Sequence, residues 1–310
     1  MKLKGKRVVV TGSSMGIGRK IALLMAKEGA QVVINARRSD AVIAVVTEIL
    51  AQGGTAIGVA GAVDDPAFAK ELIAQCVGQF GGIDVLVNNA AILSPEALGP
   101  VTDCSLETWD QILRVNLSGP MYTCRAALPH MVKPRWGRII NAGSFAGLGW
   151  MGGSAYIAAK SALFGLTRAM AADYGPYGIT ANVYNPEALS VMNDPAVLTQ
   201  GIRHWVDRGY RTEAEAKYLA NIGDGSGVAP WVAYLSSDEA DYINGHVFAV
   251  ESRRIAMVAL PEEEKVLFHD FKQNGPWSLD KLTSLAPLAF PVENRWPRRV
   301  GEDLLRWEKS

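Results

Sequence analysis

The sequence predicts an α/β fold in which a doubly wound parallel sheet of about seven strands carries helices on both faces. Two observations predict it. Short apolar runs of strand length alternate along the chain with segments of helical composition, and glycine-rich or polar residues follow several of these runs where a strand would end. Alternation of this kind is typical of parallel sheets, whose crossover helices cover both faces.

The expected elements follow one another from the N-terminus to about residue 250. Strands are predicted at residues 7–11, 31–35, 55–60, 83–87, 137–141, 180–184 and 246–250. Helices are predicted at residues 21–30, 41–51, 66–80, 106–131, 154–173 and 227–235, with an interruption of the fourth at Gly119-Pro120. Ligands of such sheets bind beyond the carboxyl ends of the strands. We therefore expect the glycine-rich turn after the first strand, Asn88, Ser144 and Pro186 to meet at one edge.

Two segments depart from this regular pattern. Residues 187–224 mix isolated large apolar residues with polar ones, which indicates a substrate loop, because long loops in compact domains often bind ligands. Residues 261–310 hold five prolines and three tryptophans without a clear period. A disordered tail would be poorer in aromatic residues. The sequence thus indicates one domain, residues 1–260, and a C-terminal extension, residues 261–310, that packs on the domain or on a neighbouring subunit.

Composition excludes several classes of function. The chain has 310 residues, 49% of them hydrophobic, and its 31 basic residues balance 31 acidic ones, so nothing predicts nucleic acid or a membrane as partner. The three cysteines, Cys76, Cys104 and Cys124, fit neither a disulfide framework nor a zinc site and favour a reducing, cytoplasmic setting. The four histidines are scattered and suggest no metal site. No run is apolar enough to span a bilayer, and the first residues lack the core of a signal peptide.

The turn after the first strand is rich in glycine. Gly12-Ser13-Ser14-Met15-Gly16-Ile17-Gly18 joins a predicted strand to a predicted helix. Such a turn offers free backbone N–H groups and the positive end of a helix dipole to a phosphate. An ordinary βα turn is the alternative interpretation. The glycine spacing, the following helix and the next strand together favour a dinucleotide-binding unit.

The end of the second strand bears on the choice of nucleotide. In dinucleotide folds an acidic residue near this point holds the ribose diol, whereas an arginine accommodates a 2′-phosphate. Here Asn35-Ala36 is followed by Arg37 and Arg38, and the acid is missing. Arginines on a solvated loop are the alternative interpretation. Because a guanidinium binds phosphate with charge-assisted bonds, we expect NADP(H) to be preferred over NAD(H).

A proton-transfer group is predicted in the segment after the fifth strand. Tyr156 and Lys160 lie four residues apart, hence on one face of a helix, and Ser144 precedes them by twelve residues. A neighbouring ammonium favours a phenolate and lowers the pKa of a tyrosine from about 10. A serine hydroxyl beside them could bond a substrate oxygen. We therefore expect the Tyr156 pKa to be lowered toward neutrality by Lys160.

These motifs together resemble the short-chain dehydrogenase/reductase family, in its compact, single-domain Rossmann-type form, over roughly residues 5–252. The resemblance rests on Thr11-Gly12-x-x-x-Gly16-x-Gly18, Asn88-Asn89-Ala90, Asn116 within Arg114-Val115-Asn116-Leu117, Ser144, and Tyr156-x-x-x-Lys160. It implies that Tyr156 is the general acid/base and that Ser144 polarises the substrate oxygen. Lys160 would bind the nicotinamide ribose and act on the tyrosine, and Asn116 would hold a water that links Lys160 to solvent. Asn88 would stabilise the central sheet.

Further site residues follow from the resemblance and from position along the chain. The expected cofactor-binding set is Gly12, Ser13, Ser14, Gly16, Ile17, Gly18, Arg37, Arg38, Asn89, Ala90, Tyr156, Lys160, Pro186 and Leu189. The expected substrate-binding set is Ser144, Trp150, Met151, Tyr156, Leu189 and Met192. The large apolar members of the second set favour a largely apolar small molecule.

The sequence favours one function and leaves two alternatives. It predicts an NADP(H)-dependent oxidoreductase, an alcohol dehydrogenase or ketone reductase, that interconverts a secondary alcohol and a ketone. A non-catalytic nicotinamide-nucleotide-binding scaffold or redox-sensing regulator on the same fold is the first alternative, and an isomerase or dehalogenase is the second. Small residues at Ala158, Ala162, Gly165 and Ala169 permit close helix–helix approach, and the family pairs this helix between subunits, so a homodimer or homotetramer is expected.

Overall fold

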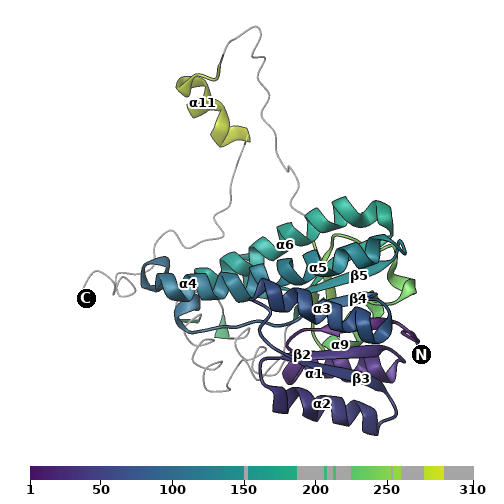
Figure 1. Cartoon of the computed structure of the whole chain (residues 1–310). Helices are drawn as coiled ribbons and strands as arrows, with labels where there is room; N and C mark the ends of the chain where they lie inside the picture. Colours follow the sequence, from purple (N-terminus) through teal and green to yellow (C-terminus); the bar gives the residue numbers. More distant parts are fainter. Residues whose placement is uncertain are drawn as a thin grey trace. The chain divides into compact units, whose positions relative to one another are not determined.

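The computed structural model describes residues 1–149, 153–186, 206–207, 212–213, 225–252, 254–259 and 276–289. The chain divides into two compact units, Met1–Val258 and Ala259–Ser310. Figure 1 shows the helices and strands of the first unit, which contains the predicted dinucleotide-binding elements. The prediction that residues 261–310 pack on the domain or on a neighbouring subunit stays a prediction.

The first unit is built on an eight-stranded sheet in the order β3-β2-β1-β4-β5-β6-β7-β8. All neighbouring strands are parallel except β7 and β8, which pair antiparallel. The strands are β1 Arg7–Val10, β2 Gln31–Ala36, β3 Thr55–Ala60, β4 Val85–Asn88, β5 Gly137–Ala142, β6 Ile179–Pro186, β7 Val247–Val250 and β8 Ile255–Val258. The predicted doubly wound parallel sheet is confirmed.

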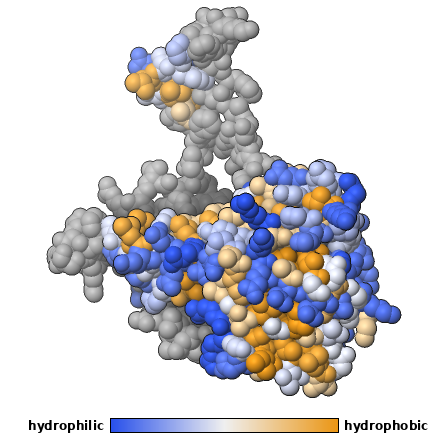
Figure 2. All heavy atoms as spheres, viewed as in Figure 1, coloured by the Kyte–Doolittle hydropathy of each residue, from blue (hydrophilic) through white to orange (hydrophobic). Residues whose placement is uncertain are grey.

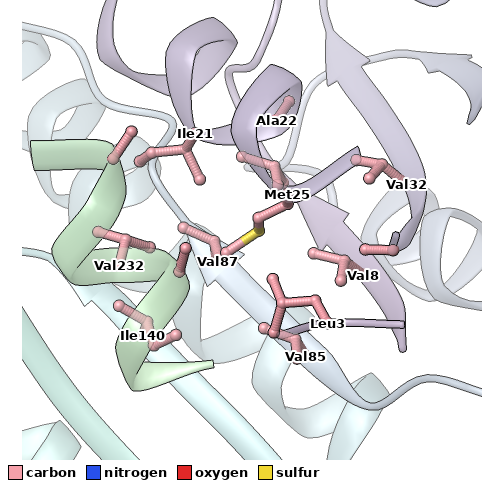
Figure 3. Packing of buried hydrophobic residues seen from close by; sticks show 14 of the residues in the cluster. Leu3, Val8, Ile21, Ala22, Met25, Val32, Val85, Val87, Ile140 and Val232 are labelled. Atoms are coloured by element: carbon pink, nitrogen blue, oxygen red, sulfur yellow. The ribbon is translucent and has the colours of Figure 1, made fainter. Parts of the chain in front are cut away.

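Helices cover the sheet on both faces. They are α1 Gly16–Lys27, α2 Ser39–Ala51, α3 Pro66–Phe80, α4 Leu106–Leu113, α5 Gly119–Val132, α6 Ala155–Tyr174 and α9 Val228–Leu235. Ile21 and Met25 of α1 pack with Val232 of α9 on one face of the central strands (Figure 3). On the other face, side chains of α3, α5 and α6 form a second buried cluster. Val8 and Val10 belong to the first cluster and Val9 to the second, as the two-residue period of a strand requires.

Several element bounds carry clear chemical signals. Asp65 caps α3 by accepting a 2.8 Å hydrogen bond from the Ala67 N–H, Pro66 occupies the first turn, and Gly81 ends the helix with a φ of 80°. These are the residues that start and stop helices, so residues 66–80 were predicted at their observed bounds. Helix α1 begins at Gly16, five residues before the predicted start at residue 21. Its first turn contains Gly16 and Gly18, which the prediction left outside the helix. Because glycine is a poor helix former, the sequence did not indicate a helix at these residues.

Two elements were not predicted. Strand β8 raises the sheet to eight strands instead of about seven, and helix α11, Leu279–Ala289, lies in the second unit, where the sequence pattern was irregular. None of the helices in the described part of the chain is both long and apolar enough to cross a membrane. On the face of the first unit seen in Figure 2, hydrophilic and hydrophobic residues are interspersed.

Candidate active site

The carboxyl ends of the central strands bring the predicted site residues to one edge of the sheet. Asn88 ends β4, and Ser144 follows β5 by two residues. Pro186 ends β6, and the glycine-rich turn of residues 12–18 follows β1. Because β1, β4, β5 and β6 are parallel neighbours, these four ends lie side by side, as the sequence predicts.

The glycine-rich turn leaves the start of α1 open. Gly12 and Gly16 have φ angles of 62° and 56°, which side-chain-bearing residues rarely adopt. Met15 precedes the helix in an extended conformation and makes no side-chain capping hydrogen bond. A Cβ on Gly18 would lie 2.3 Å from the Asn89 amide nitrogen, so this position has room only for glycine. The helix N-terminus therefore presents backbone N–H groups that its N-cap residue, Met15, does not bond.

Ser13 has an internal role in this turn. Its side chain is fully buried, its hydroxyl donates a 2.7 Å hydrogen bond to the Val10 carbonyl, and it accepts one of 3.0 Å from the Asn35 N–H. The predicted cofactor contact of Ser13 stays a prediction, and Ser13 is left out of the set proposed below because both functions of its hydroxyl serve the β1–β2 connection. Ser14 and Ile17 are half-buried and remain in the proposed set.

The end of β2 distinguishes the two predicted arginines. Ala36 closes the strand, and Arg37 and Arg38 are both exposed. Arg38 makes an ion pair with Asp40, in which Nε donates at 3.1 Å to Oδ1 and a second nitrogen bonds Oδ2. Within the described part of the chain, no carboxylate lies within ion-pair distance of Arg37. Arg37 is thus available to an anion, whereas the guanidinium of Arg38 already has a counter-ion.

The predicted trio converges where β5 meets α6. Ser144 precedes the short helix Phe145–Leu148, and its hydroxyl accepts a 3.2 Å hydrogen bond from the Ala146 N–H. The Tyr156 phenol lies close enough to this hydroxyl for Ser144 to lower the tyrosine pKa. Lys160 lies one turn further along α6, with its ammonium nitrogen 5.7 Å from the centroid of the Tyr156 ring and 2.7 Å from the Ala142 carbonyl oxygen. One substrate oxygen could therefore meet Ser144 and Tyr156 together, with Lys160 behind them.

Burial dominates the titration of this trio. It raises the pKa of Tyr156, and the nearby Ser144 hydroxyl opposes that rise. The expectation that Lys160 lowers the tyrosine pKa is not met, because loss of solvent around the phenolate is the larger effect. Burial also lowers the pKa of Lys160 from 10.5 to about 8. At neutral pH the phenol thus carries its proton and most of the lysine is an ammonium.

Asn116 lies in an irregular helical turn. Residues Arg114–Ser118 form a π-helical turn between α4 and α5, and the Gly119 N–H donates to the Arg114 carbonyl. Pro120 has no N–H and so removes the donor that an α-helix would offer to the Asn116 carbonyl. The Asn116 side chain is fully buried and makes two 2.8 Å hydrogen bonds with the backbone of Ile92. Such π turns often mark functional sites, and this one leaves the carbonyl of Asn116 without its usual helical donor.

Asn88 and Asn89 fix the end of β4. The Asn88 amide donates a 2.9 Å hydrogen bond to the Asn141 side chain of β5 and accepts one of 2.6 Å from Thr123 of α5. These bonds agree with its expected role in holding the central sheet. Asn89 and Ala90 both donate backbone hydrogen bonds of 3.0 Å to the Thr11 hydroxyl, which ties them to the glycine-rich turn.

Comparison with known proteins decides the family. The profile of the short chain dehydrogenase family matches residues 6–198. The chain belongs to this family. It is 36% identical over 247 residues to the 3-oxoacyl-[acyl-carrier-protein] reductase FabG of Staphylococcus aureus (strain Mu50 / ATCC 700699), a match that covers 79% of this chain and 96% of that protein.

Two further relatives widen the comparison. The (2S)-[(R)-hydroxy(phenyl)methyl]succinyl-CoA dehydrogenase subunit BbsD of Thauera aromatica is 31% identical over 256 residues, covering 81% of this chain and 96% of that protein. The crystal structure of a short chain dehydrogenase from Mycobacterium avium superimposes with a TM-score of 0.77 at 31% identity, covering 93% of this chain and 96% of that one. This short-chain dehydrogenase is therefore an NAD(P)-dependent oxidoreductase.

The residues of this dehydrogenase fit a nicotinamide nucleotide. The start of α1, which Met15 does not cap, suits a pyrophosphate, and Arg37, which has no carboxylate partner among the described residues, is exposed where β2 ends. Half-buried Pro186 stands at the end of β6, at the same edge of the sheet as the glycine-rich turn. Four predicted residues lie outside the described part of the chain: Trp150, Met151, Leu189 and Met192. Tyr184, which sequence reasoning did not single out, donates a 3.0 Å hydrogen bond to the side chain of Asn89.

Proposed function

We propose that this protein is an NADP(H)-dependent reductase that converts a ketone on a largely apolar small molecule to a secondary alcohol, and runs the reverse reaction when the alcohol is supplied. The observation that carries the proposal is the closeness of Ser144, Tyr156 and Lys160 at the carboxyl edge of the sheet, where Ser144 acts on the tyrosine pKa and the lysine ammonium lies 5.7 Å from the tyrosine ring. This arrangement offers two hydroxyl groups to one oxygen atom and a cation that no carboxylate neutralises among the described residues.

Each side chain would have a separate task in this reaction. When bound, the nicotinamide supplies the hydride that reaches the carbonyl carbon. Negative charge then develops on the carbonyl oxygen, where the Ser144 hydroxyl donates a hydrogen bond and Tyr156 donates the proton. Lys160 would hold the nicotinamide ribose and restore the proton to Tyr156, and Asn116 would hold a water that links Lys160 to solvent.

The titration behaviour supports reduction as the favoured direction at neutral pH. Burial raises the pKa of Tyr156, so the phenol carries the proton that a developing alkoxide needs. Alcohol oxidation requires the opposite state, a phenolate that accepts a proton. We therefore propose that oxidation needs a more alkaline solution than reduction.

Arg37 supports the choice of NADP(H). It is exposed at the end of β2, its neighbour Ala36 presents no carboxylate to repel a 2′-phosphate, and no counter-ion occupies it among the described residues. The proposed set for this nucleotide is Gly12, Ser14, Gly16, Ile17, Gly18, Arg37, Asn89, Ala90, Tyr156, Lys160, Pro186 and Leu189. Arg38 is left out of the phosphate contacts because it pairs with Asp40.

The substrate class rests on the apolar residues around Ser144 and on the relatives' names. Phe145 directly follows Ser144. In the sequence, Trp150 and Met151 come between Ser144 and Tyr156, and Leu189 and Met192 come after Pro186. By their names, FabG reduces a 3-oxoacyl group and BbsD dehydrogenates a hydroxy(phenyl)methyl group. A ketone flanked by an acyl chain or an aromatic ring is therefore the proposed substrate type for this chain.

The test is turnover of a substrate panel by the purified full-length protein. The panel holds 3-oxoacyl thioesters, aryl ketones and cyclic ketones with NADPH or NADH, and the matching alcohols with the oxidised nucleotides. We expect NADPH consumption with at least one ketone at neutral pH. Tight nucleotide binding without turnover of any substrate would contradict the proposal in favour of a non-catalytic nucleotide-binding protein.

A further inference from the structure

Tyr184 is a large polar residue in the middle of an otherwise apolar cluster. It belongs to β6, is fully buried, and packs with Val10 of β1 and Phe248 of β7 on the face that α1 and α9 cover. Burial raises the pKa of Tyr184 well above its ordinary value, so the hydroxyl keeps its proton and acts as a donor. Its hydrogen-bond acceptor is the side-chain oxygen of Asn89, at 3.0 Å.

The register of β4, β5 and β6 explains how Tyr184 reaches Asn89. Asn88 of β4 is the partner of Asn141 of β5, and Ala142 of β5 is the partner of Tyr184. Asn89 directly follows the end of β4, and Tyr184 lies two strand spacings from that end, about 10 Å at about 4.8 Å each. Ala142, the register partner of Tyr184 on the intervening strand, has only a methyl side chain. A tyrosine on β6 thus reaches past β5 to the end of β4.

Asn89 also contacts the glycine-rich turn, so it connects Tyr184 to that turn. Its amide nitrogen donates 3.0 Å hydrogen bonds to the carbonyl oxygens of both Thr11 and Gly12. The amide nitrogen also lies where a Cβ on Gly18 would collide, which shows how closely the first turn of α1 packs against it. With its oxygen held by Tyr184 and its nitrogen by two carbonyls, the amide of Asn89 has one orientation. Gly12 and Gly18 both belong to the turn proposed to bind the pyrophosphate.

We propose that Tyr184 is a positioning residue for the nicotinamide nucleotide, acting through the side chain of Asn89 on the glycine-rich turn. The inference rests on the proposed function, because it concerns the nucleotide site of that same reaction. Tyr184 does not touch the reacting atoms. Loss of the Tyr184 hydroxyl frees the Asn89 amide to rotate, so its hydrogen bonds to the Thr11 and Gly12 carbonyls become weaker. Binding of the nucleotide then weakens, while the proton donor is unchanged.

The experiment compares nucleotide affinity in the wild type, Tyr184→Phe and Tyr184→Leu. Both variants remove the hydroxyl, while the shapes of their side chains differ, so a packing fault peculiar to one is not shared by the other. Tyr234→Phe is the matched control. Tyr234 lies on α9, and its hydroxyl makes an exposed hydrogen bond with the Tyr242 hydroxyl. We measure Kd for NADPH by titration, then KM and kcat with a ketone that the wild type turns over.

The expected result is a split between binding and chemistry. Kd and KM for NADPH rise about 3- to 12-fold in both Tyr184 variants, as loss of one hydrogen bond implies, whereas kcat stays within about twofold. Tyr234→Phe leaves all three values unchanged. An Asn89→Ala variant should lose no further affinity when Tyr184→Phe is added, because the two residues act in series.

Other outcomes overturn the inference in distinguishable ways. If the wild type binds NADPH and both Tyr184 variants bind it equally well, the positioning role is wrong while the proposed function stands. A fall in kcat with unchanged Kd would also overturn it, since Tyr184 would then act on the chemical step. If the wild type binds neither NADPH nor NADH, the proposed function fails and this inference fails with it.

Discussion

The ammonium of Lys160 donates a 2.7 Å hydrogen bond to the carbonyl oxygen of Ala142, and the lysine side chain is only 2% exposed. Burial lowers the lysine pKa from 10.5 to about 8. Between these two values the unfolded chain binds the proton and the folded chain has released it, so the fold becomes more stable as pH rises through that window. A shift of this size corresponds to about 3 kcal/mol.

Replacing Lys160 with methionine should remove this pH dependence. We expect the free energy of unfolding of the wild type, relative to that of Lys160→Met, to rise by up to about 3 kcal/mol between pH 7 and pH 10.5. Urea denaturation at several pH values measures it, and Lys133→Met, which removes an exposed lysine, is the matched control. A difference that does not change with pH, or that changes equally in the control, would contradict the prediction.

Tyr156→Phe should remove the proton donor and leave the nucleotide site in place. We expect kcat for ketone reduction to fall by about 10²–10⁴-fold, the usual contribution of a positioned acid, with Kd for NADPH within about threefold of the wild type. Tyr177→Phe, which removes a hydroxyl from a tyrosine that is 40% exposed, is the control. A Tyr156→Phe enzyme that kept more than about a tenth of wild-type kcat would show that another group donates the proton.

Substitution of Asn185 and of Asn182, both buried on β6, should change the melting temperature in opposite directions. Asn182 donates a 2.7 Å hydrogen bond to the Ile243 carbonyl and accepts one of 3.0 Å from the His246 N–H. Neither polar atom of the Asn185 side chain finds a hydrogen-bond partner in the described structure. Because an unpaired buried amide costs about 1–3 kcal/mol, Asn185→Leu should raise the melting temperature. Asn182→Leu should lower it. Equal destabilisation by both would show that the amide of Asn185 is satisfied in solution.

The sequence predicted the parts of the fold that local chemistry determines. Residues 55–60 and 66–80 match β3 and α3, because an apolar β-rich run and an Asp-Pro start with a glycine stop need no long-range information. The meeting of Ser144, Tyr156 and Lys160 was also predictable, since a helical spacing and one strand end determine it. The extra strand β8 was missed because four alternating residues after a tight turn carry little signal.

Contacts that depend on strand pairing and on burial could not be predicted from the sequence. The bond from Tyr184 to Asn89 depends on the pairing of β4, β5 and β6 and on a small residue at Ala142 between them. Likewise, the internal role of the Ser13 hydroxyl depends on its closeness to Asn35 of the neighbouring strand. The raised pKa of Tyr156 reflects a degree of burial that no spacing of residues reports.

Helix α6 supports the expected homo-oligomer. Ala162, Gly165 and Ala169 are exposed along it, and a Cβ on Gly165 would meet nothing within 4 Å. We expect the wild type to have the mass of two or four chains by light scattering, and Gly165→Trp to shift it to a smaller species without lowering solubility. Gly78→Trp on α3, where a Cβ also meets nothing within 4 Å, is the matched control. A monomeric wild type at micromolar concentration would contradict the prediction.

The two neighbouring arginines at the end of β2 provide the sharpest test of the cofactor. Arg37 has no carboxylate partner among the described residues, whereas Arg38 is paired with Asp40. A charge-assisted contact from Arg37 to a 2′-phosphate contributes about 1.5–3 kcal/mol, so Arg37→Ala should raise KM for NADPH by about 10- to 150-fold. KM for NADH should hardly change, because NADH lacks that phosphate. Arg38→Ala has the same charge change one residue away and should affect either KM by less than about threefold. The measurement is kcat/KM with both nucleotides in all three proteins. A wild-type preference for NADH, or equal losses from the two substitutions, would mean that Arg37 is a solvated surface charge and that the missing acid at Ala36 does not select the phosphate.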